Sequence, residues 1–144
     1  MAKKFLVQTD ELNELFAIKK LTEYLSETMN REITFDAPTD DPFRKIDFVL
    51  STGHGVEIKT HRCESTKYDS ILISVSKIGH LNHQNDGKNI LMIMFNDCIK
   101  VAQIKNLTGQ LRFGGRKPRE GSANDQELCL YLDHEPFTTI YTFE

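Results

Sequence analysis

The sequence predicts an α/β fold with a mixed central sheet flanked by helices. Three observations predict it: the chain begins with an amphipathic helical pattern, short strand patterns follow, and residues 89–95 form a continuous apolar run typical of a strand buried on both faces. The length of 144 residues fits one domain spanning 1–144. We place its core at about 10–105, followed by a basic loop at 106–127 and additional C-terminal strands at 128–144.

The first part of the core is expected to be a helix followed by three strands. Thr9 or Asp10 can cap a helix that runs to about Thr28 and stops at Asn30. Its apolar stripe consists of Leu12, Leu15, Ile18, Leu21, Leu25 and Met29. Strand patterns follow at 33–35, 46–51 and 56–61, with a loop at 38–42. Gly53 suits a tight hairpin between the last two strands.

The second part of the core is expected to be a helix followed by paired strands. Ser74 can cap a helix that carries Val75, Ile78 and Leu81 and ends near Asn85-Asp86-Gly87. The apolar strand at 89–95 comes next, and an Asn96-Asp97 turn leads to a strand at 99–104. Later strands are predicted at 128–132 and 138–143.

The composition excludes several classes of protein. No apolar run approaches the roughly 20 residues that span a bilayer, and we expect no secretory signal and no membrane partner. The sequence has no glycine-rich phosphate loop and no dinucleotide fingerprint, so no nucleotide cofactor is expected. Cys63, Cys98 and Cys129 are odd in number and widely spaced, which predicts core thiols in a reducing, cytoplasmic compartment.

The net charge of −3 hides an uneven distribution along the chain. Residues 99–119 contain six basic residues and no acidic one, whereas residues 120–144 contain six acidic residues and no Lys or Arg. Because a polyanion responds to the local field, the basic stretch fits a nucleic-acid partner despite the acidic total. The acidic end fits a different class of protein, an inhibitor that mimics DNA.

Asp47, Glu57 and Lys59 form the candidate chemical centre. Glu57 and Lys59 are two residues apart on one predicted strand, so their side chains leave the same face. If the hairpin closes around Gly53, Asp47 lies opposite Lys59 and diagonal to Glu57. Two carboxylates beside an ammonium suit Mg²⁺ and a phosphate substrate. A surface ion pair between Glu57 and Lys59 is the alternative.

These residues resemble the core motif of the PD-(D/E)XK nucleases, which have the restriction-endonuclease-like fold. The family's order of helix, three strands, helix and strand matches residues 10–105, and Ile46 replaces the proline of the family's name. The resemblance implies an endonuclease that uses Mg²⁺, with Mn²⁺ as a substitute, to hydrolyse DNA in a prokaryotic or phage-infected cell. It implies that Asp47, Glu57 and the Ile58 carbonyl hold the metal and that Lys59 serves the attacking water.

The resemblance also implies contributions from the two helices. A Glu on the first helix often completes the metal site, and Glu14 is the best match because Ile18, Leu21 and Leu25 follow it at +4, +7 and +11, which places Glu14 at the end of the apolar stripe. Glu11 is the second choice, and the helix dipole explains either acid equally well. The second helix often presents a polar residue towards the site, here Lys77, with His80 and Gln84 on neighbouring turns. A solvated helix face is the alternative for these three.

The basic loop is the predicted DNA contact. Its candidate residues, together with Lys77, are Arg112, Phe113, Arg116, Lys117 and Arg119. The cations can displace counterions from phosphates, and the aromatic ring can stack on an unpaired base. We expect DNA rather than RNA as the substrate. A homodimer is expected because cutting both strands requires two such sites.

Two alternatives to a general DNA endonuclease stay open. One is a non-catalytic nucleic-acid-binding or accessory protein that retains the fold, although the intact Asp47, Glu57 and Lys59 speak against it. The other is a structure-specific nuclease, because the chain's size and nine-residue gap resemble those of small phage Holliday-junction resolvases.

Overall fold

The structure is a computed structural model that describes residues 10–37, 46–115 and 126–144. In chain order, its elements are α1 (Asp10–Met29), β1 (Phe35–Asp36), β2 (Phe48–Leu50), β3 (Gly55–Thr60), β4 (Ser70–Ser74), α2 (Val75–His83), η2 (Gln84–Gly87), β5 (Asn89–Met94), β6 (Cys98–Gln103), η3 (Ile104–Asn106), β7 (Gly109–Gly115), β8 (Gln126–Asp133) and β9 (Thr138–Thr142). In these ranges no helix has the length and apolar character needed to cross a membrane.

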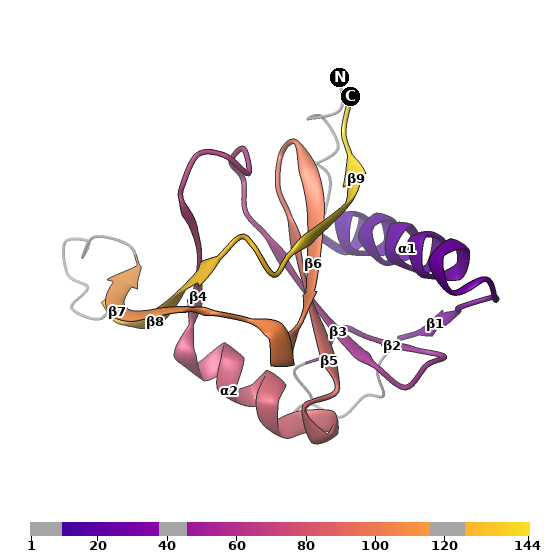
Figure 1. Cartoon of the computed structure of the whole chain (residues 1–144), viewed down its shortest axis with the longest axis horizontal. Helices are drawn as coiled ribbons and strands as arrows, with labels where there is room; N and C mark the ends of the chain where they lie inside the picture. The colour runs from indigo at the N-terminus through magenta and orange to yellow at the C-terminus, as the bar shows by residue number, and fades with distance from the viewer. Residues whose placement is uncertain (1–9, 38–45, 116–125) are drawn as a thin grey trace.

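The central sheet is mixed, as the sequence predicts. Its six strands lie in the order β1-β2-β3-β5-β6-β9, and β3 and β5 are parallel whereas the other neighbouring pairs are antiparallel. α1 and α2 lie on opposite sides of this sheet (Figure 1). The parallel β3–β5 pair requires the crossover connection that α2 supplies.

A second sheet was not predicted from the sequence. It has three strands in the order β4-β8-β7, all antiparallel. The interpretation of 106–127 as a basic loop is wrong for Gly109–Gly115, which is strand β7 paired with β8. The sequence does not predict β4 because the last of its five residues is Ser74, whose local signal is that of a helix cap. The late strands were predicted and are present as β8 and β9.

Alternation along β5 divides the core into two layers. Ile90, Met92 and Met94 join the cluster under α1, which also contains Ile18 and Leu21. Leu91, Ile93 and Phe95 join the cluster under α2 and the second sheet, where Ile71, Ile78, Leu81 and Leu132 pack. All six residues of β5 are buried, which confirms the strand predicted from the continuous apolar run.

The extent of α1 agrees with the sequence prediction, but its buried face does not. Asn13, Ala17, Ile18, Leu21 and Thr22 are buried, whereas Leu12, Leu15 and Met29 are 50%, 38% and 43% exposed. The predicted stripe is therefore wrong at both ends of the helix. Periodicity alone does not reveal which of several overlapping stripes meets the sheet. Asn30 ends the helix in the left-handed region, with φ 53°.

α2 has the predicted boundaries. The Ser74 hydroxyl accepts a hydrogen bond from the Lys77 backbone N–H at 3.3 Å. At the other end, Asn85, Asp86 and Gly87 all have positive φ and stop the helix. Cys98 and Cys129 are buried and Cys63 is half-buried, and none of the three forms a disulfide, which agrees with the prediction. The predicted loop at 38–42 lies outside the described residues.

Candidate active site

The β2–β3 hairpin brings Asp47 and Glu57 together. Gly53 N–H donates to the Leu50 carbonyl and Leu50 N–H to the His54 carbonyl, each at 2.8 Å, so the turn is centred on Thr52. Gly53 closes the loop with φ 95°, a conformation that favours glycine. Phe48 consequently faces Val56, and the next residue along, Asp47, lies beside Glu57.

The predicted register, with Asp47 opposite Lys59, is therefore wrong by two residues. The sequence places glycines at 53 and 55 but does not fix which position of the turn Gly53 takes. A shift of two residues preserves the face of the sheet, because side chains alternate with a period of two. Asp47 and Glu57 are consequently brought together, as the sequence analysis predicts, although by a different pairing.

Asp47 continues the hydrogen bonding of β2 past the end of that strand. Its backbone N–H donates to the Val56 carbonyl at 2.9 Å. Its side-chain Oδ2 accepts the Ile58 backbone N–H at 2.8 Å. A carboxylate thus occupies the place where a further β2 carbonyl would bind β3. This contact fixes Asp47 against the centre of β3, next to Glu57.

Glu57 is an acidic residue inside the protein, 5% exposed. Its neighbours Val56 and Ile58 belong to the cluster under α1, so Glu57 itself faces the α2 side of the sheet. Lys77, in the first turn of α2, meets it there, with Nζ 3.0 Å from Glu57 Oε2. Lys77 was predicted to face this site, and the structure places it in direct contact with Glu57.

Burial raises the pKa of both carboxyl groups. For Asp47, loss of hydration outweighs the opposing effects of the Ile58 N–H bond and the charges of Lys77 and Lys59. For Glu57, loss of hydration and the neighbouring Asp47 charge raise the pKa, and Lys77 and Lys59 partly offset them. Asp47, Glu57, Lys59 and Lys77 therefore form one electrostatic unit. In this unit the two lysines offset the cost of burying the two acids only in part.

The structure does not bring Glu14 into this unit. Within residues 10–37, 46–115 and 126–144, no three His, Cys, Asp or Glu side chains are grouped closely enough to hold a metal ion. Glu14 belongs to α1, which covers the Val56 and Ile58 face of β3, whereas Glu57 faces α2. The alternative, Glu11, has a side chain outside the described residues.

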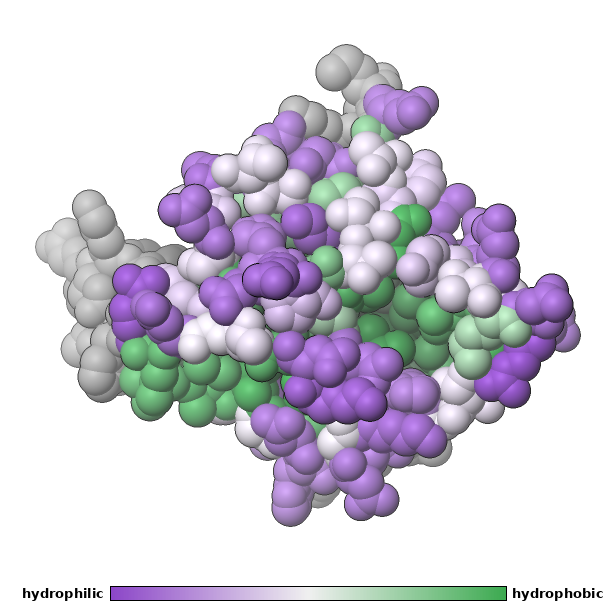
Figure 2. Space-filling view, viewed as in Figure 1, coloured by the Kyte–Doolittle hydropathy of each residue, from purple (hydrophilic) through white to green (hydrophobic). Residues whose placement is uncertain are grey.

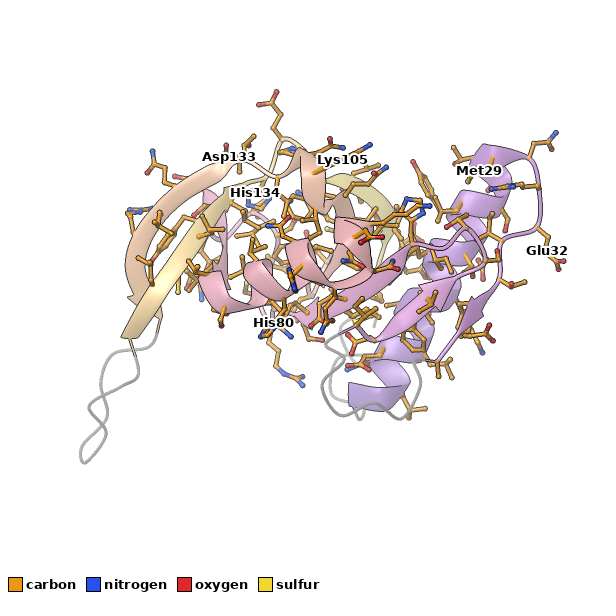
Figure 3. All side chains as sticks on the ribbon, turned by 90° about the horizontal axis from the view of Figure 1, so that it is seen from below. Met29, Glu32, His80, Lys105, Asp133 and His134 are labelled. Atoms are coloured by element: carbon orange, nitrogen blue, oxygen red, sulfur yellow. The ribbon has the colours of Figure 1, made fainter. Side chains whose placement is uncertain are left out.

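The remaining helix candidates lie away from the two carboxylates. His80 is exposed on the outer side of α2 (Figure 3). Gln84 follows the last residue of α2, at the opposite end from Lys77. The one-turn spacing from the Ser74 cap to Lys77 is a sequence signal for a side chain at the start of a helix. It contains no information about Glu57 as the partner.

Two of the predicted DNA contacts, Arg112 and Phe113, lie on β7. The Arg112 guanidinium lies 4.0 Å from the centre of the Tyr131 ring, on the neighbouring strand. Leu111 and Leu128 are exposed, and an apolar area covers this part of the surface in Figure 2. Arg116, Lys117 and Arg119, and the side chain of Phe113, lie outside the described residues.

The donor set fits a hard divalent cation. Asp47 and Glu57 supply carboxylate oxygens, which Mg²⁺ prefers, and Mg²⁺ commonly binds through one or two carboxylates while keeping several waters. A divalent ion would add positive charge beside two acids whose burial the neighbouring lysines offset only in part. In the structure, Lys77 supplies part of this positive charge through its ion pair with Glu57.

Comparison with known proteins adds one match. A family model described as "Phage putative PDDEXK endonuclease" matches residues 3–140 of the chain. The matched range contains every residue of the site described above. No curated protein matches the chain.

Proposed function

The chain belongs to the phage-type PDDEXK endonuclease family, and from this premise we propose that it hydrolyses phosphodiester bonds in DNA with Mg²⁺. The observation that carries the proposal is the convergence of Asp47 and Glu57 beside Lys59 and Lys77 on one face of the central sheet. Two carboxylates with raised pKa values and two ammonium groups are suited to bind a cation and an anionic phosphate together.

Asp47 and Glu57 would hold the metal ion. Ile58 donates its N–H to Asp47, and in an antiparallel ladder the N–H and carbonyl of one residue point to the same neighbouring strand. The Ile58 carbonyl therefore points towards the Asp47 side of β3, which supports its proposed role as a further ligand. When bound, a divalent ion polarises the phosphodiester and lowers the pKa of a bound water.

The two lysines have distinct proposed roles. Lys59 lies two residues beyond Glu57 on the same face of β3, where its ammonium group can orient the attacking water and stabilise the charge that develops on the phosphate. Lys77 holds the Glu57 carboxylate in place in the free protein. With a divalent ion held by Glu57, the Lys77 ammonium group would be available to a DNA phosphate.

The proposal is tested by incubating the protein with supercoiled, linear, single-stranded and branched DNA in Mg²⁺ or Mn²⁺. Asp47→Ala and Lys59→Ala are the site variants. Asp36→Ala and Lys19→Ala are matched controls, because both residues are exposed and lie on other elements. Metal-dependent cleavage that is lost in both site variants and kept in both controls supports the proposal. Cleavage of branched DNA alone would identify a structure-specific nuclease.

The Lys77–Glu57 ion pair favours a second candidate function. A lysine ammonium group that already neutralises a buried carboxylate can replace the metal in a protein that binds DNA without cutting it. In that case wild type and site variants are equally inert in every metal, while wild type still shifts DNA in a gel. Cleavage by wild type eliminates this candidate.

A homodimer is part of the proposal for double-strand cleavage. One site of this kind cuts one strand, so two copies are needed to cut both strands in one encounter. Sedimentation of the protein with and without a duplex substrate tests this directly. A monomer on the duplex that nonetheless produces double-strand breaks in a single binding event contradicts it.

A further inference from the structure

A cavity of about 560 Å³ opens beyond the end of β3, at some distance from the two carboxylates. Its walls come from the segment after β3, from the start of β4 and from residues around the end of β8 (Figure 1). Its principal lining side chains are His61, Tyr68, Phe95, Tyr131 and His134. This volume is within the usual range for a small-molecule site.

Several of the side chains that line the cavity carry rings, and three of these rings pack against one another. His61 meets Phe95 edge to face at 5.7 Å between ring centres, and Phe95 stacks with His134 at 6.3 Å. His134 is fixed at both ring nitrogens, with Nε2 3.2 Å from the Tyr68 carbonyl and Nδ1 3.3 Å from Lys100 Nζ. Such preformed ring surfaces bind flat aromatic ligands at low cost in conformational entropy.

Cationic side chains accompany these rings. Arg62 and Lys67 line the cavity and are exposed, and Lys67 Nζ lies 5.4 Å from the centre of the Tyr68 ring. Burial and the charge of Lys59 lower the pKa of His61, which disfavours the charged form of its ring. Flat rings with cations beside them are the arrangement that binds a base through stacking and its phosphate through charge.

The cavity and the carboxylate pair lie along one face of the same strand. Glu57, Lys59 and His61 alternate with residues that point to the other face, so all three leave the α2 side of the sheet. His61 follows the last residue of β3 and lies four residue steps from Glu57, which is about 13 Å at a rise of about 3.3 Å per residue. A nucleic-acid strand covers that length in a few nucleotides.

We propose that this cavity receives an unpaired base of the same strand whose phosphate lies at Asp47 and Glu57. A base paired inside a duplex has both faces covered by its neighbours and offers none to these rings, so the ligand is an extruded, bulged or single-stranded nucleotide. Because every base has a π face, stacking here tolerates any base sequence. The inference rests on the proposed function and makes it specific: the preferred substrate carries an unpaired nucleotide a few positions from the cleaved bond.

The test measures binding in EDTA, where no cleavage takes place. Two duplexes of equal length are compared, one fully paired and one with a single unpaired 2-aminopurine nucleotide. We expect wild type to bind the second about tenfold more tightly, the effect of one base–aromatic stack, with quenching of the 2-aminopurine fluorescence. Equal affinity for the two duplexes, or affinity without quenching, overturns the inference.

Tyr68→Ala and Arg62→Ala are the diagnostic variants, and Arg31→Ala is the control. Tyr68 is 60% exposed and the two arginines are exposed, so none of the substitutions removes a core side chain. Tyr68→Ala is expected to abolish most of the preference for the unpaired nucleotide while affinity for the paired duplex stays unchanged. Arg62→Ala weakens binding of the unpaired duplex more than Arg31→Ala does. A uniform loss for both duplexes in Tyr68→Ala contradicts the inference.

A free mononucleotide is the remaining arm of the test. If a free deoxynucleoside monophosphate at equal concentration does not displace the duplex with the unpaired nucleotide, and does not change its 2-aminopurine fluorescence, the site takes its base from a nucleic-acid strand. Binding of the mononucleotide as tight as that of the duplex identifies a site for a free nucleotide and overturns the inference. The test measures binding and not cleavage. A protein that prefers the duplex with the unpaired nucleotide but cleaves no DNA therefore refutes only the proposed hydrolysis.

Discussion

Lys77 Nζ lies 3.0 Å from Glu57 Oε2, so the first turn of α2 is joined to the centre of β3 by an ion pair whose side chains are 22% and 6% exposed. The contact connects the structure of the site to its chemistry. It stabilises an acid that the strand pattern directs into the protein interior, and it places an ammonium group where a phosphate would approach. The charge state of Glu57 consequently affects the stability of the protein, and under the proposed function it would also affect activity.

Replacing Lys77 by Ala leaves the buried Glu57 carboxylate without this partner and raises its pKa further. A carboxyl group with a raised folded pKa costs stability as pH rises from its unfolded value, about 4.3, through its folded value. We expect Lys77→Ala to lower the free energy of unfolding by about 2 kcal/mol at pH 8 and by much less at pH 5. The loss at pH 8 is smaller than for a fully buried ion pair because Lys77 is partly exposed. Urea denaturation at both pH values measures this, with His80→Ala as control. An equal loss at both pH values contradicts it.

Asp47→Asn is expected to stabilise the metal-free protein while abolishing cleavage. The amide keeps an oxygen for the Ile58 N–H but removes the charge that raises the pKa of Glu57. We expect a gain of about 1 kcal/mol at pH 7.5, or about 3–5 °C in Tm. Mg²⁺ at 100 times its Kd is expected to stabilise wild type by about 2.7 kcal/mol and Asp47→Asn by much less. An equal response of Tm to Mg²⁺ in both proteins would falsify a metal site at Asp47.

The pH dependence of cleavage follows from the raised pKa values of Asp47 and Glu57. Both carboxyl groups must be ionised to hold a cation, so activity is complete above their folded pKa values and falls as pH decreases through them. We expect this fall in activity, the acid limb of the pH profile, to lie above pH 4, near which ordinary carboxyl groups titrate. Because metal competes with protons, raising Mg²⁺ is expected to shift this limb to lower pH. If the acid limb does not move when the Mg²⁺ concentration is raised, groups other than Asp47 and Glu57 cause it.

Gly55→Ala and Gly79→Ala are expected to change stability in opposite directions. A Cβ at Gly55 would collide with Asn89 Oδ1 and lie 2.9 Å from Ile46. Asn89 has little freedom to move, because its amide donates to the carbonyls of Leu81 and Gln84. We expect Gly55→Ala to lose about 1–3 kcal/mol. Gly79 lies in α2 with open space around it, so Gly79→Ala gains about 0.5–1 kcal/mol. Thermal denaturation compares the two, and stabilisation by Gly55→Ala would refute the packing argument.

Arg112 is expected to contact a DNA phosphate. It is exposed on β7 and its guanidinium is oriented by the Tyr131 ring. Arg112→Ala is predicted to weaken binding equally for all duplex sequences and to reduce the slope of log affinity against log salt by about 1. The comparison is with Arg31→Ala, an exposed arginine next to the end of α1. An unchanged salt slope in Arg112→Ala would exclude a phosphate contact at this position.

Local patterns in the sequence predicted most of the elements. The cap at Ser74, the left-handed stop at Asn30 and the apolar run of β5 are confirmed, because each depends on interactions within a few residues. The shared face of Glu57 and Lys59 follows from the period of a strand alone. The β4–β8 pairing and the exposed side of α1 were not predicted, because both depend on segments that are distant in the sequence.

The features of the site also divide into those that the sequence predicts and those that only the tertiary structure decides. The sequence by itself determined the two acids and the lysine of the hairpin, and thereby the family, because residue type and spacing are local properties. The tertiary structure alone decided that Asp47 lies beside Glu57, that Lys77 neutralises Glu57, and that Glu14 stays with the opposite face. It also decided that the segment after Lys59 encloses a ring-lined cavity. Turn geometry and helix docking fix these relations, and both depend on the packing of the whole chain.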